Sequence, residues 1–342
     1  MSNIIDIETF LELKITIPVI DVRSPKEFDH AHIPGAINLP LFSDEEREKV
    51  GICYKKQGRD TAILMGLELV GPKMADLGRK AKELAPDNKL LVHCWRGGMR
   101  SSSMAWLFNT IGIETQTLNG GYKTYRRYLK SYFARELKLV VLGGMTGSGK
   151  TEILKEMSGL GAQVIDLEGL ANHKGSAFGA IGQKEQSTTE QFENNLFKEL
   201  VLFDLEKPIW VEDESQTIGK IWIPEEFFNQ MRNKEVIRIN VPKELRIKWL
   251  VEVYGGFDHE LLRDSVGRIK KRIGGLNYNL AIEALENNEL EKLVDMVLSY
   301  YDKTYQYGLS IRSQLKIYPI DLVGINHRSN AIKILEFYKT LC

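Results

Sequence analysis

The chain has 342 residues, which is enough for two domains with separate hydrophobic cores. Lys and Arg together number 46, as do Asp and Glu, so no overall field attracts a polyanion, and a nucleic-acid site must be a local patch. Three cysteines are too few for a disulfide framework or a zinc site, which favours a reducing compartment. We find neither a signal peptide nor an apolar run near the ~20 residues that span a bilayer, and we predict a cytoplasmic protein with no membrane partner.

The first half of the chain reads as a small α/β domain over residues 1–134. Residues 17–22 and 90–94 have the short, apolar, partly β-branched pattern of strands, and residues 75–85 have helical spacing. Strands that alternate with helices predict a parallel sheet. In such sheets the reactive groups lie at the carboxyl ends of the strands, and Cys94 stands at one of these ends.

The loop after Cys94 has the composition of a site for a reactive sulfur. A glycine-containing turn leads into a helix predicted at residues 101–110, so main-chain N–H groups surround the thiol. These groups, with the charges of Arg96 and Arg100, favour the nucleophilic thiolate. The same cradle would hold a persulfide, a perselenide or an incoming oxyanion. The alternative is a buried structural cysteine, an interpretation that suits Cys53 and Cys342.

The second half, residues 135–342, begins with a phosphate-binding pattern. A buried strand is predicted at residues 139–142, and the residues after it fit G-x-x-x-x-G-K-[ST]. The predicted phosphate-binding residues are Gly144, Met145, Thr146, Gly147, Ser148, Gly149, Lys150 and Thr151. Glycines let consecutive N–H groups point at an anion, and the following helix adds the positive end of its dipole. Lys150 supplies a mobile charge, and Thr151 a hydroxyl suited to Mg²⁺. The alternative is a chance glycine turn before a helix.

Acidic residues follow two further predicted strands of this half. Residues 162–165 lead to Asp166 and Glu168, and residues 208–211 lead to Glu212 and Asp213. Phosphate-loop proteins place the carboxylate that orients Mg²⁺ at such a strand end. We expect Asp213, or else Glu212, to serve Mg²⁺ with Thr151, although solvated loop acids are also common there.

The remaining pattern of the second half is mainly helical. A long helix is predicted at residues 188–205, and another strand at residues 235–241. From about residue 243 to residue 342 the spacing of apolar residues is helical.

Two basic clusters stand out against the neutral total. The first predicted tRNA-binding cluster contains Lys123, Arg126, Arg127 and Lys130, interleaved with Tyr122, Tyr125, Tyr128 and Tyr132. The second contains Lys270, Lys271 and Arg272. Phosphate contacts from cations and base stacking on tyrosine are what tRNA binding needs. A solvated helix face explains such charges equally well.

Several runs resemble a known family. Residues 21–28 (Asp-Val-Arg-Ser-Pro-Lys-Glu-Phe), residues 32–40 (His-Ile-Pro-Gly-Ala-Ile-Asn-Leu-Pro) and the loop from Cys94 to Arg100 resemble the rhodanese domain. The resemblance implies that Cys94 carries a transferable chalcogen, that Asp21 and Arg23 support its loop, and that the stretch from residue 32 is mainly structural. Together with the phosphate loop and residues 175–179 (Gly-Ser-Ala-Phe-Gly), the whole chain resembles the tRNA 2-selenouridine synthases.

This resemblance implies a reaction. Members of the family convert 2-thiouridine at the wobble position of tRNA to 2-selenouridine, through S-geranylation with geranyl diphosphate and then selenation with selenophosphate. The implied partners are tRNA, both small substrates and the selenophosphate-producing enzyme. We expect no tightly bound cofactor and count Mg²⁺ as a candidate ion. An apolar groove must take the geranyl chain. Its candidate residues are Phe178, Ile181, Trp210 and Trp222, each of which also reads as plain core.

Two other functions fit the residues alone. One is a rhodanese-type sulfurtransferase fused to an ATP-dependent small-molecule kinase. The other is a regulatory protein with a degenerate rhodanese domain, against which the presence of Cys94, Arg100 and Lys150 argues.

Overall fold

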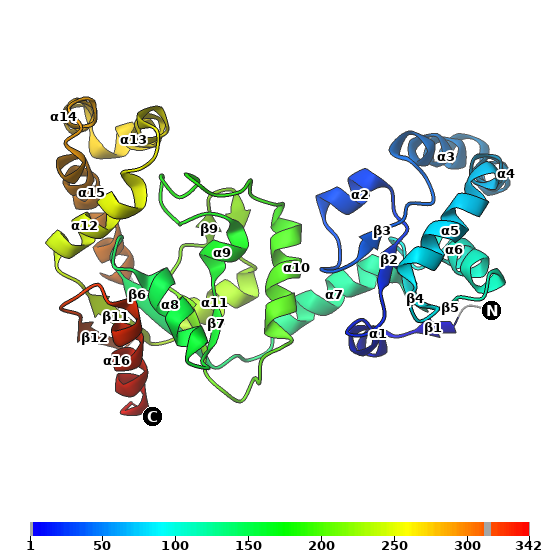
Figure 1. Cartoon of the computed structure of the whole chain (residues 1–342), viewed down its shortest axis with the longest axis horizontal. Helices are drawn as coiled ribbons and strands as arrows, with labels where there is room; N and C mark the ends of the chain where they lie inside the picture. The colour runs from blue at the N-terminus through cyan, green and yellow to red at the C-terminus, as the bar shows by residue number, and fades with distance from the viewer. Residues whose placement is uncertain (1–2, 311–315, 342) are drawn as a thin grey trace. The chain divides into compact units, whose positions relative to one another are not determined.

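Two parallel sheets organise the chain as two compact α/β units. In the computed structural model, which describes residues 3–310 and 316–341, these units are Met1–Tyr132 and Phe133–Cys342. Figure 1 shows the sheet and the helices of each unit. The α/β class predicted from the sequence is confirmed.

The first unit is built on a five-stranded sheet whose pairings are all parallel. Its strands, in spatial order, are β1 (Asn3–Ile5), β5 (Glu114–Leu118), β4 (Lys89–His93), β2 (Val19–Asp21) and β3 (Ile37–Asn38). Its helices are α1 (Ile7–Leu13), α2 (Pro25–His30), α3 (Asp44–Gln57), α4 (Arg59–Val70), α5 (Met74–Leu84), α6 (Met99–Thr110) and α7 (Gly121–Phe133), with a 3₁₀ turn at Gly71–Lys73. The inner strands β2 and β4 are buried along nearly their whole length, as expected of parallel strands covered on both faces.

The predicted elements of this unit correspond to β2, α5, β4 and α6. Strand β2 is shorter than predicted and begins only after Pro18, which has no N–H to give to a sheet. Strand β4 ends at His93, so Cys94 is the first residue of the following loop.

The second unit contains another five-stranded parallel sheet. Its strands, in spatial order, are β12 (Ile317–Asp321), β11 (Val236–Asn240), β6 (Leu139–Gly144), β8 (Ile209–Glu212) and β7 (Gln163–Ile165). Helices α8 (Lys150–Gly159) and α16 (His327–Lys339) pack side by side, as Figure 1 shows. The unit also contains α9 (Leu167–Ala171), α10 (Thr189–Leu200), α11 (Glu225–Asn233) and a hairpin of β9 (Thr217–Ile218) with β10 (Ile221–Trp222).

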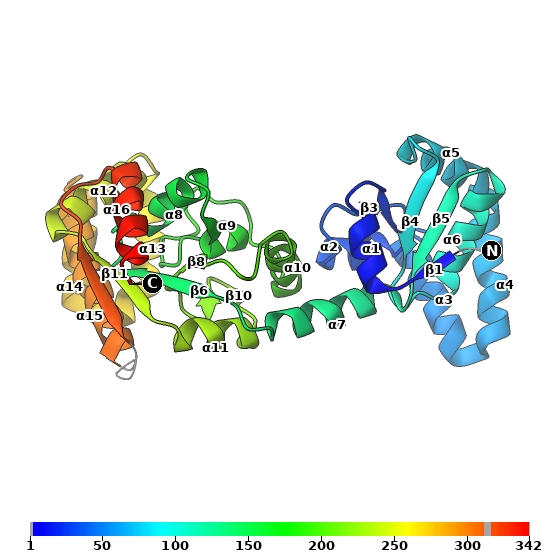
Figure 2. The ribbon, with the colours of Figure 1, turned by 90° about the horizontal axis from the view of Figure 1, so that it is seen from below.

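A helical layer follows β11, and Figure 2 shows it from another side. It consists of α12 (Lys243–Tyr254), α13 (His259–Ile273), α14 (Gly275–Glu286) and α15 (Leu290–Ser310). The predicted helical region is therefore confirmed, but it is interrupted by β12, which the sequence analysis missed. The helix predicted at residues 188–205 ends at Leu200, before a loop that contains Pro208.

Burial corrects two predictions and supports another. Trp222 is 56% exposed, so it is not a core residue, because its strand lies in the small hairpin rather than in the main sheet. Tyr122 and Tyr125 are fully buried, and Tyr132 is 8% exposed. These three tyrosines pack in the core and cannot stack on bases. Cys53 is buried, as predicted for a structural cysteine, whereas Cys342 lies outside the described residues.

Candidate functional site

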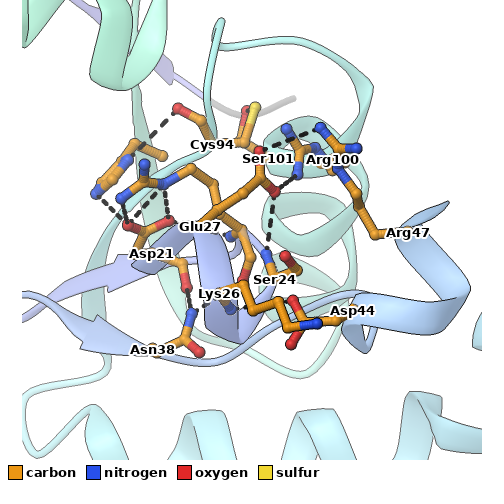
Figure 3. Close-up of polar contacts among 12 residues, drawn as sticks. Asp21, Ser24, Lys26, Glu27, Asn38, Asp44, Arg47, Cys94, Arg100 and Ser101 are labelled. Atoms are coloured by element: carbon orange, nitrogen blue, oxygen red, sulfur yellow. Dashed lines mark hydrogen bonds and ion pairs between the residues drawn. The ribbon is translucent and has the colours of Figure 1, made fainter. Parts of the chain in front are cut away.

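Cys94 occupies the turn between β4 and α6, and Figure 3 shows its surroundings. The residue is only 3% exposed, yet it lines an open cavity. Its Sγ lies 3.3 Å from Oγ of Ser101, and the Ser101 hydroxyl also donates to the carbonyl oxygen of Gly98 at 3.0 Å. Since one hydroxyl has one proton, Ser101 accepts from the thiol while it donates to Gly98, and would have to turn in order to donate to a thiolate.

Glycines give the Cys94 loop its shape. Gly97 has a φ of +62°, and a Cβ at this residue would lie 2.7 Å from the carbonyl oxygen of Leu118. A Cβ at Gly121 would collide with the carbonyl oxygen of Cys94. The first turn of α7 then fixes the loop from outside, because the N–H of Tyr122 donates to Cys94 O at 2.9 Å. The loop is held by main chain on two sides.

The two arginines predicted beside Cys94 differ in their surroundings. Arg100 donates from Nη1 to Oε2 of Glu27 at 2.7 Å, and Arg47 approaches the other carboxylate oxygen at 3.7 Å. Burial alone would raise the pKa of Glu27, but the hydrogen bond and charge of Arg100 outweigh it and lower the pKa. Arg96 is exposed. Both predicted arginines line the same cavity of about 1020 Å³ as Cys94. The sequence analysis missed Glu27, although Ser24-x-x-Glu27 has the spacing of a helix capping box.

Asp21, which is labelled in Figure 3, forms a fully buried pair with Arg23. Arg23 donates from Nη2 to Oδ2 of Asp21 at 2.6 Å and to the carbonyl oxygen of Ala31 at 2.8 Å. Its guanidinium lies 4.0 Å from the ring centre of Tyr122. The pair therefore links β2, the loop after α2 and the start of α7, which places it where a support for the Cys94 loop is needed.

His32 has the geometry of a structural residue. Its Nδ1 lies 3.0 Å from the carbonyl oxygen of Phe28, and its ring stacks on the Phe28 ring at 4.0 Å.

The predicted phosphate-binding residues form one loop between β6 and α8. Residues 145–149 connect the two elements, and Gly147 and Gly149 have φ values of +79° and +73°. A Cβ at Gly144 would lie 2.6 Å from Ile239, and one at Gly149 would lie 2.7 Å from the ring of His327. The loop thus needs glycine for its backbone and for close packing. With the exception of the half-buried Met145, the predicted residues line a cavity of about 300 Å³.

Lys150 and Thr151 lie at the start of α8 and face different partners. The ammonium group of Lys150 donates to the carbonyl oxygen of Gly144 at 3.0 Å. The hydroxyl of Thr151 donates to Oε2 of Glu168 at 2.8 Å. Lys150 therefore lies folded over its own loop, and Thr151 points toward an acidic wall of the cavity.

Two glutamates, Glu168 and Glu214, line this wall, and a third, Glu212, is buried next to Glu168. Burial raises the pKa of Glu168, and burial together with the charge of Glu168 raises the pKa of Glu214 to about 8. Burial also raises the pKa of Glu212 well above its usual value, and its Oε1 accepts the main-chain N–H of Glu168 at 2.8 Å. A Cβ at Gly175, whose φ is +65°, would lie 2.8 Å from Glu168 and 3.0 Å from Glu214. The loop of residues 175–179 therefore closes directly over the carboxylates.

The donors at this wall fit Mg²⁺, which prefers oxygen and usually takes one or two carboxylates together with substrate phosphates. Thr151 and Asp213, the two residues expected to serve Mg²⁺, both line the cavity. Glu168, which the sequence analysis noted only as an acid after a strand, accepts the hydrogen bond of Thr151. Glu212 is completely buried and does not line the cavity, because its carboxylate supports the backbone of Glu168. Within residues 3–310 and 316–341, no group of three or more His, Cys, Asp or Glu side chains is arranged to hold a metal by itself.

A small apolar pocket adjoins the phosphate-loop cavity. It measures about 40 Å³ and is lined by side chains of α12, α13 and α15, together with Phe178. Five residues line both spaces, namely Thr146, Ser176, Leu250, Tyr254 and Tyr301. Of the four apolar candidates, only Phe178 belongs to this pocket, whereas Trp210 is buried in the core of the sheet.

The basic clusters lie on two helices. On α7, Lys123, Arg127 and Lys130 are exposed and Arg126 is half-buried. In the last turn of α13, Lys270, Lys271 and Arg272 are exposed, a position where positive charge also favours the helix dipole. Among the described residues, no helix has the length and apolar character required to cross a membrane.

Comparison with known proteins gives matches to both units. Residues 137–319 match the family model described as the tRNA 2-selenouridine synthase AAA domain, and residues 7–128 match the rhodanese-like domain. A tRNA 2-selenouridine synthase from Nitrosomonas europaea is 40% identical over 81% of this chain and 73% of its own length. Those of Shewanella sediminis and Hydrogenovibrio crunogenus are 33% and 36% identical, over 93% and 88% of this chain and 95% and 91% of their own.

Proposed function

This chain belongs to the family of tRNA 2-selenouridine synthases, and we propose that it makes 2-selenouridine from wobble 2-thiouridine in two steps, with one unit serving each step. The second unit catalyses S-geranylation with geranyl diphosphate, and the first unit delivers selenium from selenophosphate. The observation that carries the first assignment is the apolar pocket next to the phosphate loop.

In the first step the sulfur of 2-thiouridine attacks the allylic carbon of geranyl diphosphate. The C–S bond forms, the C–O bond to the diphosphate breaks, and the diphosphate leaves with the electron pair. Negative charge therefore grows on the diphosphate oxygens, where the main-chain N–H groups of residues 144–149 and the ammonium of Lys150 stabilise it. In order to reach the phosphates, Lys150 exchanges its hydrogen bond with Gly144 for one with the leaving group.

An isoprenoid chain is the substituent that suits the neighbouring space. The polar end of a prenyl diphosphate occupies the cavity of about 300 Å³, and its chain enters the apolar pocket between α12 and α15. Five shared lining residues place the two spaces side by side. The pocket of about 40 Å³ takes only the first carbons, so the full chain requires partly buried side chains such as Tyr254 to move.

Mg²⁺ fits the acidic wall of the cavity. Thr151, Glu168 and Asp213 would hold it, and it would supply further positive charge to the departing diphosphate. The residues of the chain would orient the diphosphate and keep water from the allylic carbon.

In the second step we assign the handling of selenium to Cys94. Selenium replaces the S-geranyl group at C2 of the base, so that a C–Se bond forms, the C–S bond breaks and the geranylthiolate leaves with the electron pair. Water cleaves the Se–P bond of selenophosphate, and phosphate is released. Arg96 and Arg100 neutralise the phosphate of selenophosphate. Because Arg100 is held by Glu27, an incoming phosphate must compete with that carboxylate.

The tRNA itself requires cationic surface on both units. We assign phosphate contacts to Lys123, Arg126, Arg127 and Lys130 on α7 and to Lys270, Lys271 and Arg272 on α13. With three tyrosines of α7 buried, these contacts are electrostatic, and their strength should fall steeply with added salt.

The test is a single assay with two variants. Purified protein is incubated with thiolated tRNA, geranyl diphosphate and selenophosphate, and the nucleosides are identified by mass. Cys94→Ala should abolish selenium incorporation and leave geranylation within about twofold of the parent. Lys150→Ala should reduce geranylation by about a hundredfold, the usual cost of removing one donor to a developing oxyanion. Cys53→Ala, a change at a buried cysteine outside both cavities, is the control and should affect neither step.

Two outcomes count against the proposal. Loss of both steps in Cys94→Ala would show that the units do not divide the reaction. Geranylation by Lys150→Ala at the parental rate would show that the diphosphate leaving group does not bind in the phosphate loop.

A further inference from the structure

A buried arginine connects the helical layer to the phosphate loop. Arg246 of α12 is 3% exposed, and its Nη1 donates to the main-chain carbonyl oxygen of Thr146 at 3.1 Å. The guanidinium also donates two hydrogen bonds of 2.8 Å to Asp302 of α15, one to each carboxylate oxygen. Thr146 and Gly147 line the phosphate-loop cavity, whereas Arg246 and Asp302 are not among its lining residues. The arginine therefore acts on the loop from outside the space that a ligand would occupy.

The bond to Thr146 fixes the direction of the next N–H group. A peptide unit is planar and trans, so the C=O of Thr146 and the N–H of Gly147 point in opposite directions. Because Arg246 holds the oxygen, the N–H of Gly147 is directed away from the guanidinium. Among the described residues this N–H has no hydrogen-bond partner. It is a donor with a fixed orientation and no internal acceptor.

Close packing leaves the peptide little freedom to turn. Gly147 has a φ of +79°, and a Cβ there would lie 2.8 Å from Leu250 of α12. The helix that carries Arg246 thus presses against the same residue whose N–H it orients. One residue before Asp302, Tyr301 accepts the main-chain N–H of Ala177 at its hydroxyl at 2.8 Å. One turn of α15 therefore braces both the phosphate loop and the loop of residues 175–179.

We propose that Arg246 and Asp302 are positioning residues that hold the Thr146–Gly147 peptide so that the Gly147 N–H faces the diphosphate. This proposal rests on the proposed function, since it needs a diphosphate in the phosphate loop. Asp302 neutralises the buried guanidinium, so the pair works through direction rather than through net charge. Lysine at residue 246 keeps the charge but lacks the rigid fork that reaches Asp302 and Thr146 together.

The experiment compares Arg246→Lys and Asp302→Asn with Lys243→Met in the full-length protein. Lys243 pairs with Asp295 at 2.5 Å and joins the same two helices, but the pair is partly exposed and does not line the phosphate-loop cavity. The readouts are affinity for inorganic diphosphate by titration calorimetry, kcat and KM for geranylation, and the thermal midpoint. Arg246→Lys and Asp302→Asn should each weaken diphosphate binding and lower kcat by about tenfold, as for one lost hydrogen bond to a charged group. Lys243→Met should keep parental values of both.

Further outcomes separate this inference from the proposed function. If Lys150→Ala loses diphosphate affinity while both Arg246→Lys and Asp302→Asn keep it, the inference is overturned and the proposed function stands. A lower thermal midpoint with parental diphosphate affinity in the folded protein reduces the pair to a structural role and also overturns it. If the parent binds ATP but no inorganic diphosphate, the proposed function is wrong, and the inference that depends on it is wrong as well. Should Arg246→Lys fail to fold, the isosteric Asp302→Asn decides.

Discussion

Two arginines near Cys94, Arg23 and Arg100, are held in ion pairs. Arg23 is bound to Asp21 inside the unit, and Arg100 is bound to Glu27 at the cavity. The first pair is completely buried, so its contribution depends on both charges being present. The second is partly exposed, so under the proposed function Arg100 can exchange Glu27 for the phosphate of a substrate. Pairing of this kind gives one arginine a structural role and keeps the other available for phosphate.

The buried pair predicts a pH-dependent stability. Burial alone would raise the pKa of Asp21, but His93 and the hydrogen bonds and charge of Arg23 outweigh it and lower the pKa. A lowered folded-state pKa contributes stability above the unfolded value of about 3.9, and this stability is lost as the pH falls through the folded-state pKa. Asp21→Asn, which leaves Arg23 without its carboxylate, should cost about 3 kcal/mol at pH 7.

Thermal unfolding of the parent and of Asp21→Asn between pH 7 and pH 3 tests whether this stability is lost on acidification. The difference between the two proteins should be largest at neutral pH and should shrink at the acid end. A difference that grew on acidification would contradict the assignment of the charge to Asp21.

Gly175 predicts a steric effect on catalysis. Alanine at this residue would place Cβ 2.8 Å from Glu168 and 3.0 Å from Glu214 and would strain a φ of +65°. The carboxylates would have to move away from Thr151, so geranylation should fall by at least about tenfold in kcat/KM, the effect of a misplaced catalytic group. Gly256→Ala, where no atom lies within 4 Å, should keep parental activity. Equal activity of the two variants would show that the contact between residue 175 and the acids does not matter for the reaction.

At the scale of secondary structure, the apolar pocket is formed by three helices and two loops, one of which is the phosphate loop. Residues of α12, α13 and α15 contribute to its wall, and Phe178 comes from the loop that follows Gly175. Helices α12 and α13 are consecutive in the sequence, but α15 and the loop of Phe178 lie further away. Composition and periodicity could identify each helix as amphipathic, but they could not show that the apolar faces leave a gap beside the phosphate loop.

Filling this gap should affect the chain of the substrate and not its phosphates. Val294 lines the pocket and is only half-buried, so Val294→Phe adds bulk with little strain elsewhere. We expect KM for geranyl diphosphate to rise about tenfold, since several apolar carbons lose their burial. Affinity for inorganic diphosphate should stay unchanged. Val323→Phe, at a residue that is 89% exposed, controls for the added aromatic ring. If Val294→Phe weakened the binding of geranyl diphosphate and of inorganic diphosphate equally, the geranyl chain would not occupy this pocket.

Three of the strands that the sequence analysis missed, β1, β3 and β12, lie at sheet edges. β12 contains Pro319, which removes one N–H from the strand and makes its sequence atypical of a central strand. It lies at the edge of its sheet, where such a residue is tolerated. β1 and β3 also lie at edges and have three and two residues, which is too short for an alternating pattern to show. Inner strands such as β4 and β6 could be predicted because both of their faces are buried.

For the molecule as a whole, the sequence predicts local motifs better than long-range partners. Cys94 and the phosphate loop could be located because each fits a short pattern at a strand end. Asp21 and Arg23 were named through the resemblance to the rhodanese domain, but their ion pair was not predicted. Glu27 and Glu168 meet their partners Arg100 and Thr151 across 73 and 17 residues of sequence, and no spacing rule connects them. Tyr122 and Tyr125 were misjudged for a related reason, because a helix in a basic run still has one face toward the core.

The charged residues, which sum to zero net charge, are distributed unevenly in the structure. Cations that are exposed on α7 and α13 form local clusters, whereas much of the remaining charge is consumed in pairs such as Lys73 with Glu46. A polyanion would therefore be attracted to particular helices rather than to the molecule at large.

The glycines around Cys94 also limit how this unit could be re-engineered. Side chains at residues 97 and 121 have no space, since main-chain atoms of Leu118 and Cys94 already occupy it. Arg96 and Met99, by contrast, are exposed at the rim of the cavity. A library intended to retarget the unit to a different chalcogen donor should therefore randomise these two rim residues and leave the floor untouched.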